Sequence, residues 1–221
     1  MRSSASLSTL TLRGFTLVEL LAVICLVFML LTLVSVGTSH LVQAAKLSEA
    51  VAQVESTLRL AAQRAGIENR EVEVRFYEVD VGPGEGVRFA AMQTMCYRIE
   101  TDPAAAAYIS PGSPGFSPQP VAVSELQRLP SGVVVHGGIF STLLTEPSRV
   151  PDPATTDVDG APRRVRRVRF LPGGGTDLEA GKKWSLLLCR SQDAAGDSLP
   201  ANYAVLAIDP ETARCSVFRP Q

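Results

Sequence analysis

The stretch Gly14-Phe15-Thr16-Leu17-Val18-Glu19 stands between a short basic leader and a long apolar run. The leader, residues 1–14, contains Arg2 and Arg13 and no acidic residue. From Phe15 to Val36 the chain has 22 residues, of which Glu19 is the only charged one. A helix of roughly 20 apolar residues is long enough to cross a bilayer. The run at 15–36 therefore predicts a membrane-spanning helix.

Glu19 and Gly14 indicate how the apolar run is processed and what it contacts. A carboxylate inside an apolar helix is costly without a partner, so we expect Glu19 to meet a positive charge. A secretory signal is normally cut after its apolar region, yet no A-x-A pattern follows Val36. The only small residue at the boundary between charged and apolar residues is Gly14, and cleavage there keeps the helix in the mature protein. The basic leader places the N-terminus in the cytoplasm.

The window from Gly14 to Glu19, followed by an apolar helix, resembles the class III signal of type IV pilins and type II secretion pseudopilins. In that family a prepilin peptidase cuts after the glycine and methylates the new N-terminal phenylalanine. The resemblance implies cleavage between Gly14 and Phe15, N-methylation of Phe15 and an assembly role for Glu19. The implied partners are the prepilin peptidase, other pilin or pseudopilin subunits and the inner membrane.

A second helical segment is expected at 37–66. Apolar residues recur there at steps of three and four, which is typical of an amphipathic helix facing a sheet. These positions are Leu47, Val51, Val54, Leu58, Ala61 (or Ala62) and Ala65. Gly66 is the expected C-cap.

From residue 67 onward the pattern changes to that of strands. Val72, Val74 and Phe76 alternate with charged residues, which predicts a half-buried strand. Further strands are expected at 87–99, from Val133, and at 165–171, 184–189, 203–208 and 215–218. A turn is expected at 82–86, and loops at 101–130, with a short helix near 124–129, and at 145–163. The predicted domains are thus a leader at 1–14, an assembly helix at 15–36, an amphipathic helix at 37–66 and a β-rich exported domain at 67–221.

The predicted fold class is α+β and pilin-like. A long N-terminal helix, membrane-spanning in its first half and amphipathic in its second, packs on antiparallel sheet. The second half of the chain resembles the H-type minor pseudopilins and FimT-like pilins. The resemblance rests on Leu129-Pro130-Ser131-Gly132-Val133-Val134-Val135, on Phe170-Leu171-Pro172-Gly173-Gly174 and on a terminal hairpin at 204–218.

No enzyme signature is present, and neither a cofactor nor a metal is expected. The chain has two histidines, His40 and His136, and lacks a phosphate loop, H-E-x-x-H and C-x-x-C. Asp152, Asp157 and Asp159 lie in one loop and offer oxygen ligands for calcium, but their spacing fits no EF-hand pattern, and a solvated turn is favoured.

The densest charge lies at 163–169, where five of seven residues are arginines: Arg163, Arg164, Arg166, Arg167 and Arg169. Such a run could bind the phosphates of a nucleic acid. Residues 37–221 nevertheless carry 19 Lys+Arg against 21 Asp+Glu, a net charge of −2, and the run contains no aromatic residue. An edge strand protected by charge is favoured, and DNA is an unlikely partner.

Outside the apolar run the chain has three cysteines, Cys96, Cys189 and Cys215, which allow one disulfide and one free thiol. The sequence does not determine which pair forms; Cys189 with Cys215 is one possibility.

These features predict a minor pilin or pseudopilin subunit that assembles through its N-terminal helix into a type IV pilus or a type II secretion pseudopilus. The alternative is a membrane-anchored pilin-like binding module whose Arg163–Arg169 patch engages DNA or a surface polymer. The expected location is the bacterial inner membrane, with a single pass, a cytoplasmic N-terminus and a periplasmic C-terminal domain. After assembly the subunit would lie in the filament.

Overall fold

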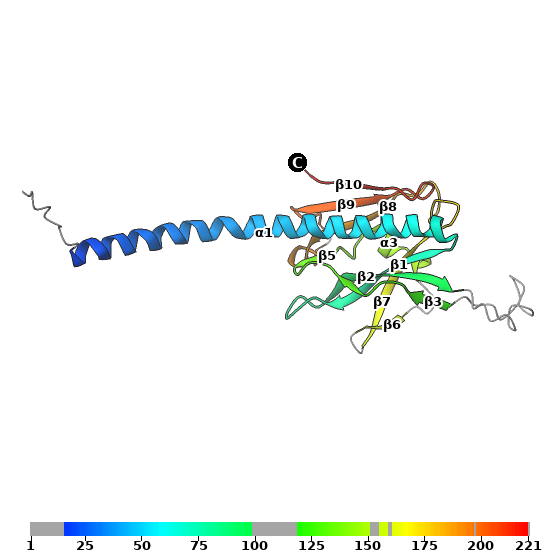
Figure 1. Cartoon of the computed structure of the whole chain (residues 1–221), viewed down its shortest axis with the longest axis horizontal. Coiled ribbons are helices and arrows are strands. Elements are labelled where there is room, and N and C mark those ends of the chain that lie inside the picture. Colours follow the sequence, from blue (N-terminus) through cyan, green and yellow to red (C-terminus); the bar gives the residue numbers. More distant parts are fainter. Residues whose placement is uncertain (1–15, 99–118, 151–154, 159–160, 197, 221) are drawn as a thin grey trace, which may run out of the picture. The chain divides into compact units, whose positions relative to one another are not determined.

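The computed structural model describes the backbone of residues 16–98, 119–150, 155–158, 161–196 and 198–220 (Figure 1). Side chains are described for 16–30, 42–97, 120–150, 163–196 and 198–220. The chain divides into two compact units, Met1–Val42 and Gln43–Gln221. The boundary between them falls six residues after Val36, where the expected assembly helix was to end.

The first element is α1, which runs from Leu17 to Glu68 over 52 residues. The expected end at Gly66 is wrong, because the helix continues through this residue. It stops at Asn69, whose φ of 49° lies in the left-handed region that asparagine tolerates. The N–H of Arg70 then donates to the carbonyl of Ala65 at 3.2 Å, which closes the helix with a Schellman motif.

The second unit is built on antiparallel strands. They are β1 (Val72–Asp80), β2 (Val87–Arg98), β3 (Gln119–Ala122), β4 (Gln127–Arg128), β5 (Val133–Val135), β6 (Thr155–Val158), β7 (Ala161–Phe170), β8 (Trp184–Arg190), β9 (Tyr203–Ile208) and β10 (Cys215–Phe218). The described strands form one ten-stranded sheet in the order β10-β9-β8-β5-β2-β1-β7-β6, with β3 and β4 paired to β2 beside this path. Within the described residues, three short helical segments interrupt the loops: α3 (Thr142–Thr145), η1 (Pro147–Arg149) and η2 (Ser191–Asp193).

Most of the strands and turns expected from period-two alternation are confirmed. The turn at 82–86 forms with Gly82, Gly84 and Gly86 at positive φ, which glycine adopts without strain. The short helix expected near 124–129 is wrong: the described segment contains β4, paired with Ala91 and Met92 of β2. The loop expected at 145–163 contains η1, β6 and the start of β7.

The strand beginning at Val72 departs from expectation in its burial. We expected one solvent-facing side, but β1 is buried on both faces from Val72 to Tyr77. The reason is that the main core covers one face, while side chains from the neighbouring strands β2 and β7 cover the other. Its charged residues Glu73 and Arg75 are 0% and 2% exposed.

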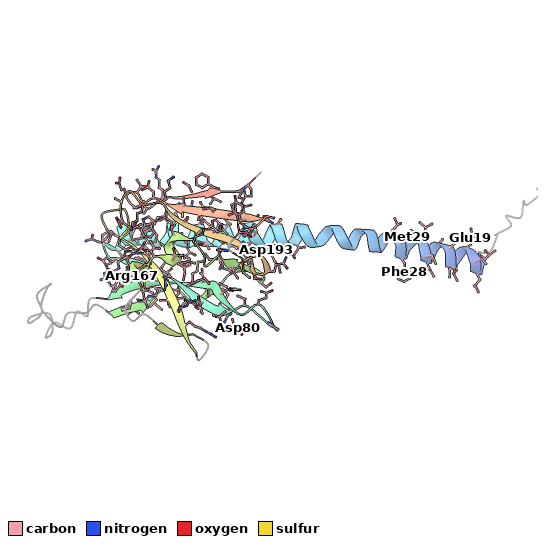
Figure 2. The ribbon with its side chains drawn as sticks, turned by 180° about the vertical axis from the view of Figure 1, so that it is seen from behind. Glu19, Phe28, Met29, Asp80, Arg167 and Asp193 are labelled. Carbon is pink, nitrogen blue, oxygen red and sulfur yellow. The ribbon has the colours of Figure 1, made fainter. Side chains whose placement is uncertain are left out.

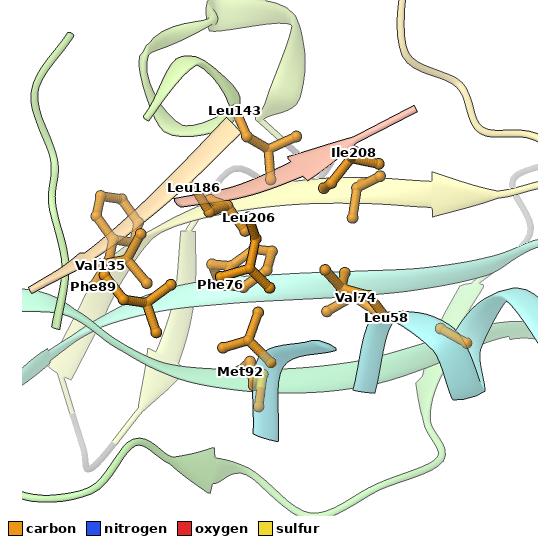
Figure 3. Packing of buried hydrophobic residues seen from close by; sticks show 14 of the residues in the cluster. Leu58, Val74, Phe76, Phe89, Met92, Val135, Leu143, Leu186, Leu206 and Ile208 are labelled. Carbon is orange, nitrogen blue, oxygen red and sulfur yellow. The ribbon is translucent and has the colours of Figure 1, made fainter. Parts of the chain in front are cut away.

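The main core lies between α1 and one face of the sheet, as Figure 3 shows for part of it. The expected helical stripe is confirmed, because its residues from Leu47 to Ala65 are buried in this cluster. The sheet contributes Phe76 from β1, Met92 from β2, and Leu186 and Leu206 from β8 and β9. A second cluster around Tyr77, Val134 and Leu187 covers the opposite face of the same strands.

The expected fold class is corrected by these observations. We expected the fold to be built around a long helix whose first half spans a membrane. The described chain is instead mostly antiparallel sheet. Where side chains are described, no helix is both long and apolar enough to cross a membrane. The expectation rested on the apolar run 15–36, and within this run the described side chains end at Leu30.

A pair of leucines on α1 tests the main core. Leu58 is 2% exposed in the cluster, whereas Leu60, two residues further along the helix, is 62% exposed. Leu58→Ala removes buried apolar contacts and should lower the free energy of unfolding by about 2–5 kcal/mol. Leu60→Ala should change it by roughly 0.5 kcal/mol or less. Denaturant unfolding measures both, and equal losses would show that the helix does not pack as described.

Candidate functional site

The N-terminal segment carries the residues expected for processing and assembly. Gly14 and Phe15 lie outside the described residues, so the expected cleavage and methylation remain predictions. Thr16 is the first described residue and caps α1. Its hydroxyl oxygen accepts a hydrogen bond from the N–H of Glu19 at 3.3 Å, and its carbonyl accepts one from Leu20 at 3.1 Å. The helix therefore begins at Leu17.

The sequence analysis did not predict this cap, in which the backbone N–H of Glu19 takes part. Thr16 and Glu19 stand at the N-cap and N3 positions of a capping box, in the spacing T-x-x-E. A carboxylate in the first turn also interacts favourably with the helix dipole. The carboxylate has no ion pair among the described residues, so Glu19 remains open to an external cation.

The surface around Glu19 is apolar on every side. The exposed large side chains from Leu17 to Leu30 are Leu17, Val18, Leu20, Leu21, Val23, Ile24, Leu26, Val27, Phe28, Met29 and Leu30. Figure 2 shows Phe28 and Met29 pointing away from the helix axis. Soluble proteins rarely expose so much contiguous apolar surface. A helix that is apolar all round is normally covered by other helices or by lipid, which marks this segment as a contact surface.

The arginine run lies within β7. Successive residues of this strand face the two sides of the sheet alternately. Residues 165–170 pair with β1, and residues 161–164 pair with β6, so β7 lies between two strands and the expected edge position is wrong. Arg167 and Arg169 lie opposite Arg75 and Glu73 of β1. The five arginines are thus divided between two surfaces and do not form a single patch.

Carboxylates neutralise three of these arginines. Arg164 binds Glu78 at 2.7 Å, Arg167 binds Asp177 at 2.5 Å, and Arg169 binds Glu71 at 3.0 Å. DNA would have to compete with these ion pairs for the guanidinium groups. The geometry therefore weighs against the nucleic-acid patch, which remains an untested hypothesis.

The two other arginines of the run form no ion pair with a described carboxylate. Arg166 donates to the carbonyl of Leu144 at 2.7 Å, and the Nε of Arg163 is buried without a described hydrogen-bond partner.

Glu73 is the centre of the network on the side of Arg167 and Arg169. Its carboxylate accepts from Arg75 Nε at 2.5 Å and from the Tyr97 hydroxyl at 2.6 Å. Arg169 donates to the same hydroxyl at 2.8 Å and lies over the Tyr97 ring at 4.7 Å. Burial, followed by the hydrogen bond and charge of Glu73, raises the pKa of Tyr97. These contacts describe a structural network with no open site.

The cysteines do not form the pair considered from the sequence. Cys189 and Cys215 are both free thiols. Cys189 lies opposite Tyr203 on β9, whereas Cys215 lies opposite Ile208, which is five residues further along that strand. At about 3.3 Å per residue this offset exceeds the reach of a disulfide. Burial is the main cause that raises the pKa of each thiol to about 12.

The acidic loop considered as a calcium site lies largely outside the described residues. Asp152 and Asp159 lie outside the described residues, and Asp157 lies on β6. Over the part of the chain that is described, no cluster of three or more His, Cys, Asp or Glu side chains could hold a metal ion.

Substituting the buried carboxylate tests the network. Glu73→Gln leaves Arg75 buried without its charge partner, which should lower the free energy of unfolding by about 3–5 kcal/mol. Glu71→Gln is the matched control, because the Glu71 side chain is 43% exposed and its pair with Arg169 should contribute about 1 kcal/mol or less. Denaturant unfolding at neutral pH measures the difference. Equal effects of the two substitutions would contradict the burial of Glu73.

Comparison of the chain with protein-family models, with curated proteins and with solved structures found no match.

Proposed function

We propose that this chain is a minor pilin-like or pseudopilin-like subunit. A prepilin peptidase would cleave it after Gly14 and methylate Phe15, and the subunit would then join a type IV pilus or type II secretion pseudopilus. The observation that carries the proposal is the exposed apolar surface of Leu17–Leu30 with Glu19 as its one charged residue. Such a surface requires a cover, and equivalent helices in a filament provide one.

Charge pairing would determine how the subunits align. Cleavage creates a positive amine at Phe15, and each charge would cost several kcal/mol if it were buried alone in a helical core. Glu19 of one subunit and the amine of its neighbour neutralise each other. A buried polar pair of this kind fixes register, as buried polar residues do in coiled coils.

Before assembly, the apolar surface would hold the subunit at the bacterial inner membrane, with the domain of residues 43–221 exported to the periplasm. The domain would then be displayed on the filament. The ion pairs of Arg164, Arg167 and Arg169 disfavour the alternative function in which the arginine run engages DNA.

Processing provides the first test. When the full chain is co-expressed with a prepilin peptidase, we expect the mature protein to begin at Phe15 and to carry one added methyl group. Intact-mass analysis measures both changes at once. A chain that keeps residues 1–14 in the presence of an active peptidase would contradict the proposal, as would a mature N-terminus beyond Val36.

Glu19 variants separate charge pairing from helix capping. Glu19→Gln keeps a side chain suited to the capping box, whereas Glu19→Ala removes both roles. If the charge pair drives assembly, both variants should be cleaved normally and should enter filaments about tenfold less often or worse. Recovery of tagged subunits with sheared filaments measures this.

The control is Glu49→Gln, which removes the same charge from an exposed position on α1 and should assemble normally. Normal assembly of Glu19→Gln together with failure of Glu19→Ala would assign Glu19 to capping and would disprove the charge pair.

A further inference from the structure

A polar cavity of about 410 Å³ lies within the unit Gln43–Gln221. Its walls come from β1, β2 and β7, from α3 and from the segments 135–138 and 194–196. The volume lies within the range of small-molecule sites. Its charged lining residues are Glu78, Arg88, Arg164 and Arg166.

These residues leave the cavity positively charged. Three guanidinium groups face one carboxylate, so the described lining has a net charge of +2. Arg164 donates to both oxygens of Glu78, at 2.9 and 2.7 Å, and this pair is neutral. The remaining charges belong to Arg88 and Arg166, neither of which forms an ion pair with a described carboxylate, although the charge of Glu78 acts on Arg166 from a longer distance.

Arg166 is held in position by backbone groups alone. Its Nε donates to the carbonyl of Leu144 at 2.7 Å, and one terminal nitrogen donates to that of Val165 at 2.9 Å. Burial, and secondly the charge of Arg164, lowers the pKa of Arg166. The charge of Glu78 acts in the opposite direction, and a bound anion would add to this stabilisation of the guanidinium group.

Arg88 is the least satisfied of the three arginines. Its Nε is buried and has no hydrogen-bond partner in the described part of the chain. A buried donor without a partner costs about 1–3 kcal/mol, so such groups usually have one. The planar fork of a guanidinium matches the two oxygens of a carboxylate or a phosphate. An oxyanion in the cavity would supply the missing acceptor.

His136 also lines the cavity, and both of its ring nitrogens form hydrogen bonds. Its Nδ1 accepts from the N–H of Gly138 at 3.0 Å, and its Nε2 donates to the carbonyl of Gly196 at 3.1 Å. These two bonds describe a neutral imidazole that joins two segments of the wall. A Cβ at position 138 would lie 2.6 Å from Cε1 of His136, so this close approach requires Gly138.

We propose that this cavity binds a compact oxyanion, a carboxylate or a phosphate group, through Arg88 with the support of Arg166. The Glu78–Arg164 pair forms the neutral side of the site. The site is independent of the N-terminal segment and of assembly into a filament, so its test does not depend on the proposed function.

Isothermal titration of the full chain, purified in detergent, tests the proposal with two probes, inorganic phosphate and succinate. We expect at least one of them to bind with a dissociation constant of about 1 mM or tighter. Arg88→Gln should weaken this binding by about tenfold or more, because it removes a charge-assisted bidentate contact. Arg59→Gln is the matched control, since Arg59 is an exposed residue on α1 with the same charge. It should bind like the wild type.

Glu78→Gln gives a test in the opposite direction and does not depend on the folding of the Arg88 variant. It raises the net charge of the lining from +2 to +3 and releases Arg164, so it should tighten binding severalfold. The probe that binds shows whether the site prefers phosphate or carboxylate. Binding of neither probe would overturn the proposal. Equal weakening by Arg88→Gln and Arg59→Gln, or weaker binding by Glu78→Gln, would do the same.

Discussion

The buried carboxylate of Glu73 is the interaction on which the arrangement of β1, β2 and β7 depends. It is 0% exposed, and a charge removed from water to that extent needs opposite charge and hydrogen bonds close by. Arg75 supplies them from the same strand, Tyr97 from β2 and Arg169 from β7. A shift of β7 by one residue would turn Arg167 and Arg169 to the other face and remove their ion pairs with Glu73. The network therefore specifies the register as well as satisfying the charge.

The same strand carries the main core on its other face. Val72, Val74 and Phe76 point toward the helix, between the residues that point toward the network. One alternating segment thus supports an apolar layer and an ionic layer. The helical stripe from Leu47 to Ala65 completes the apolar layer, which explains why the helix needs apolar residues only at steps of three and four.

The sequence located β1 correctly and predicted its environment wrongly, and the reason is physical. Alternation with period two shows where a strand lies, whereas a charge at every second position suggests solvent when its partners are unknown. The partner Arg169 lies 96 residues from Glu73, a distance at which a single sequence carries no pairing signal. The arginine run at 163–169 showed that cations were available to pair with buried carboxylates. Without the register of β7, however, the same run was equally consistent with an edge strand or a phosphate-binding site. The helical stripe and most strands were predictable because their signals are local.

The candidate site, like the fold, was predictable from the sequence only where its signals are local. Glu19 was identifiable as the one charge in an apolar run, and this required no structure. The capping role of Thr16 was also present in the sequence, in the spacing T-x-x-E, although the apolar run is the stronger signal there. Arg88 could not have been found, because it is a single arginine in a strand and its lack of a partner appears only in three dimensions.

Comparison of the three charged positions connects the fold to its proposed interactions. Glu73, Arg88 and Glu19 obey one rule, that a charge in an apolar or buried place requires a complement. For Glu73 the chain supplies the complement itself, and the result is a rigid register. For Arg88 and Glu19 the described residues supply none, and in each case our proposal assigns the complement to another molecule. For Arg88 the cavity limits that molecule to a small anion. For Glu19 the surrounding side chains are apolar, and the equivalent helix with a free amine that we propose as its partner would carry both a cation and an apolar face.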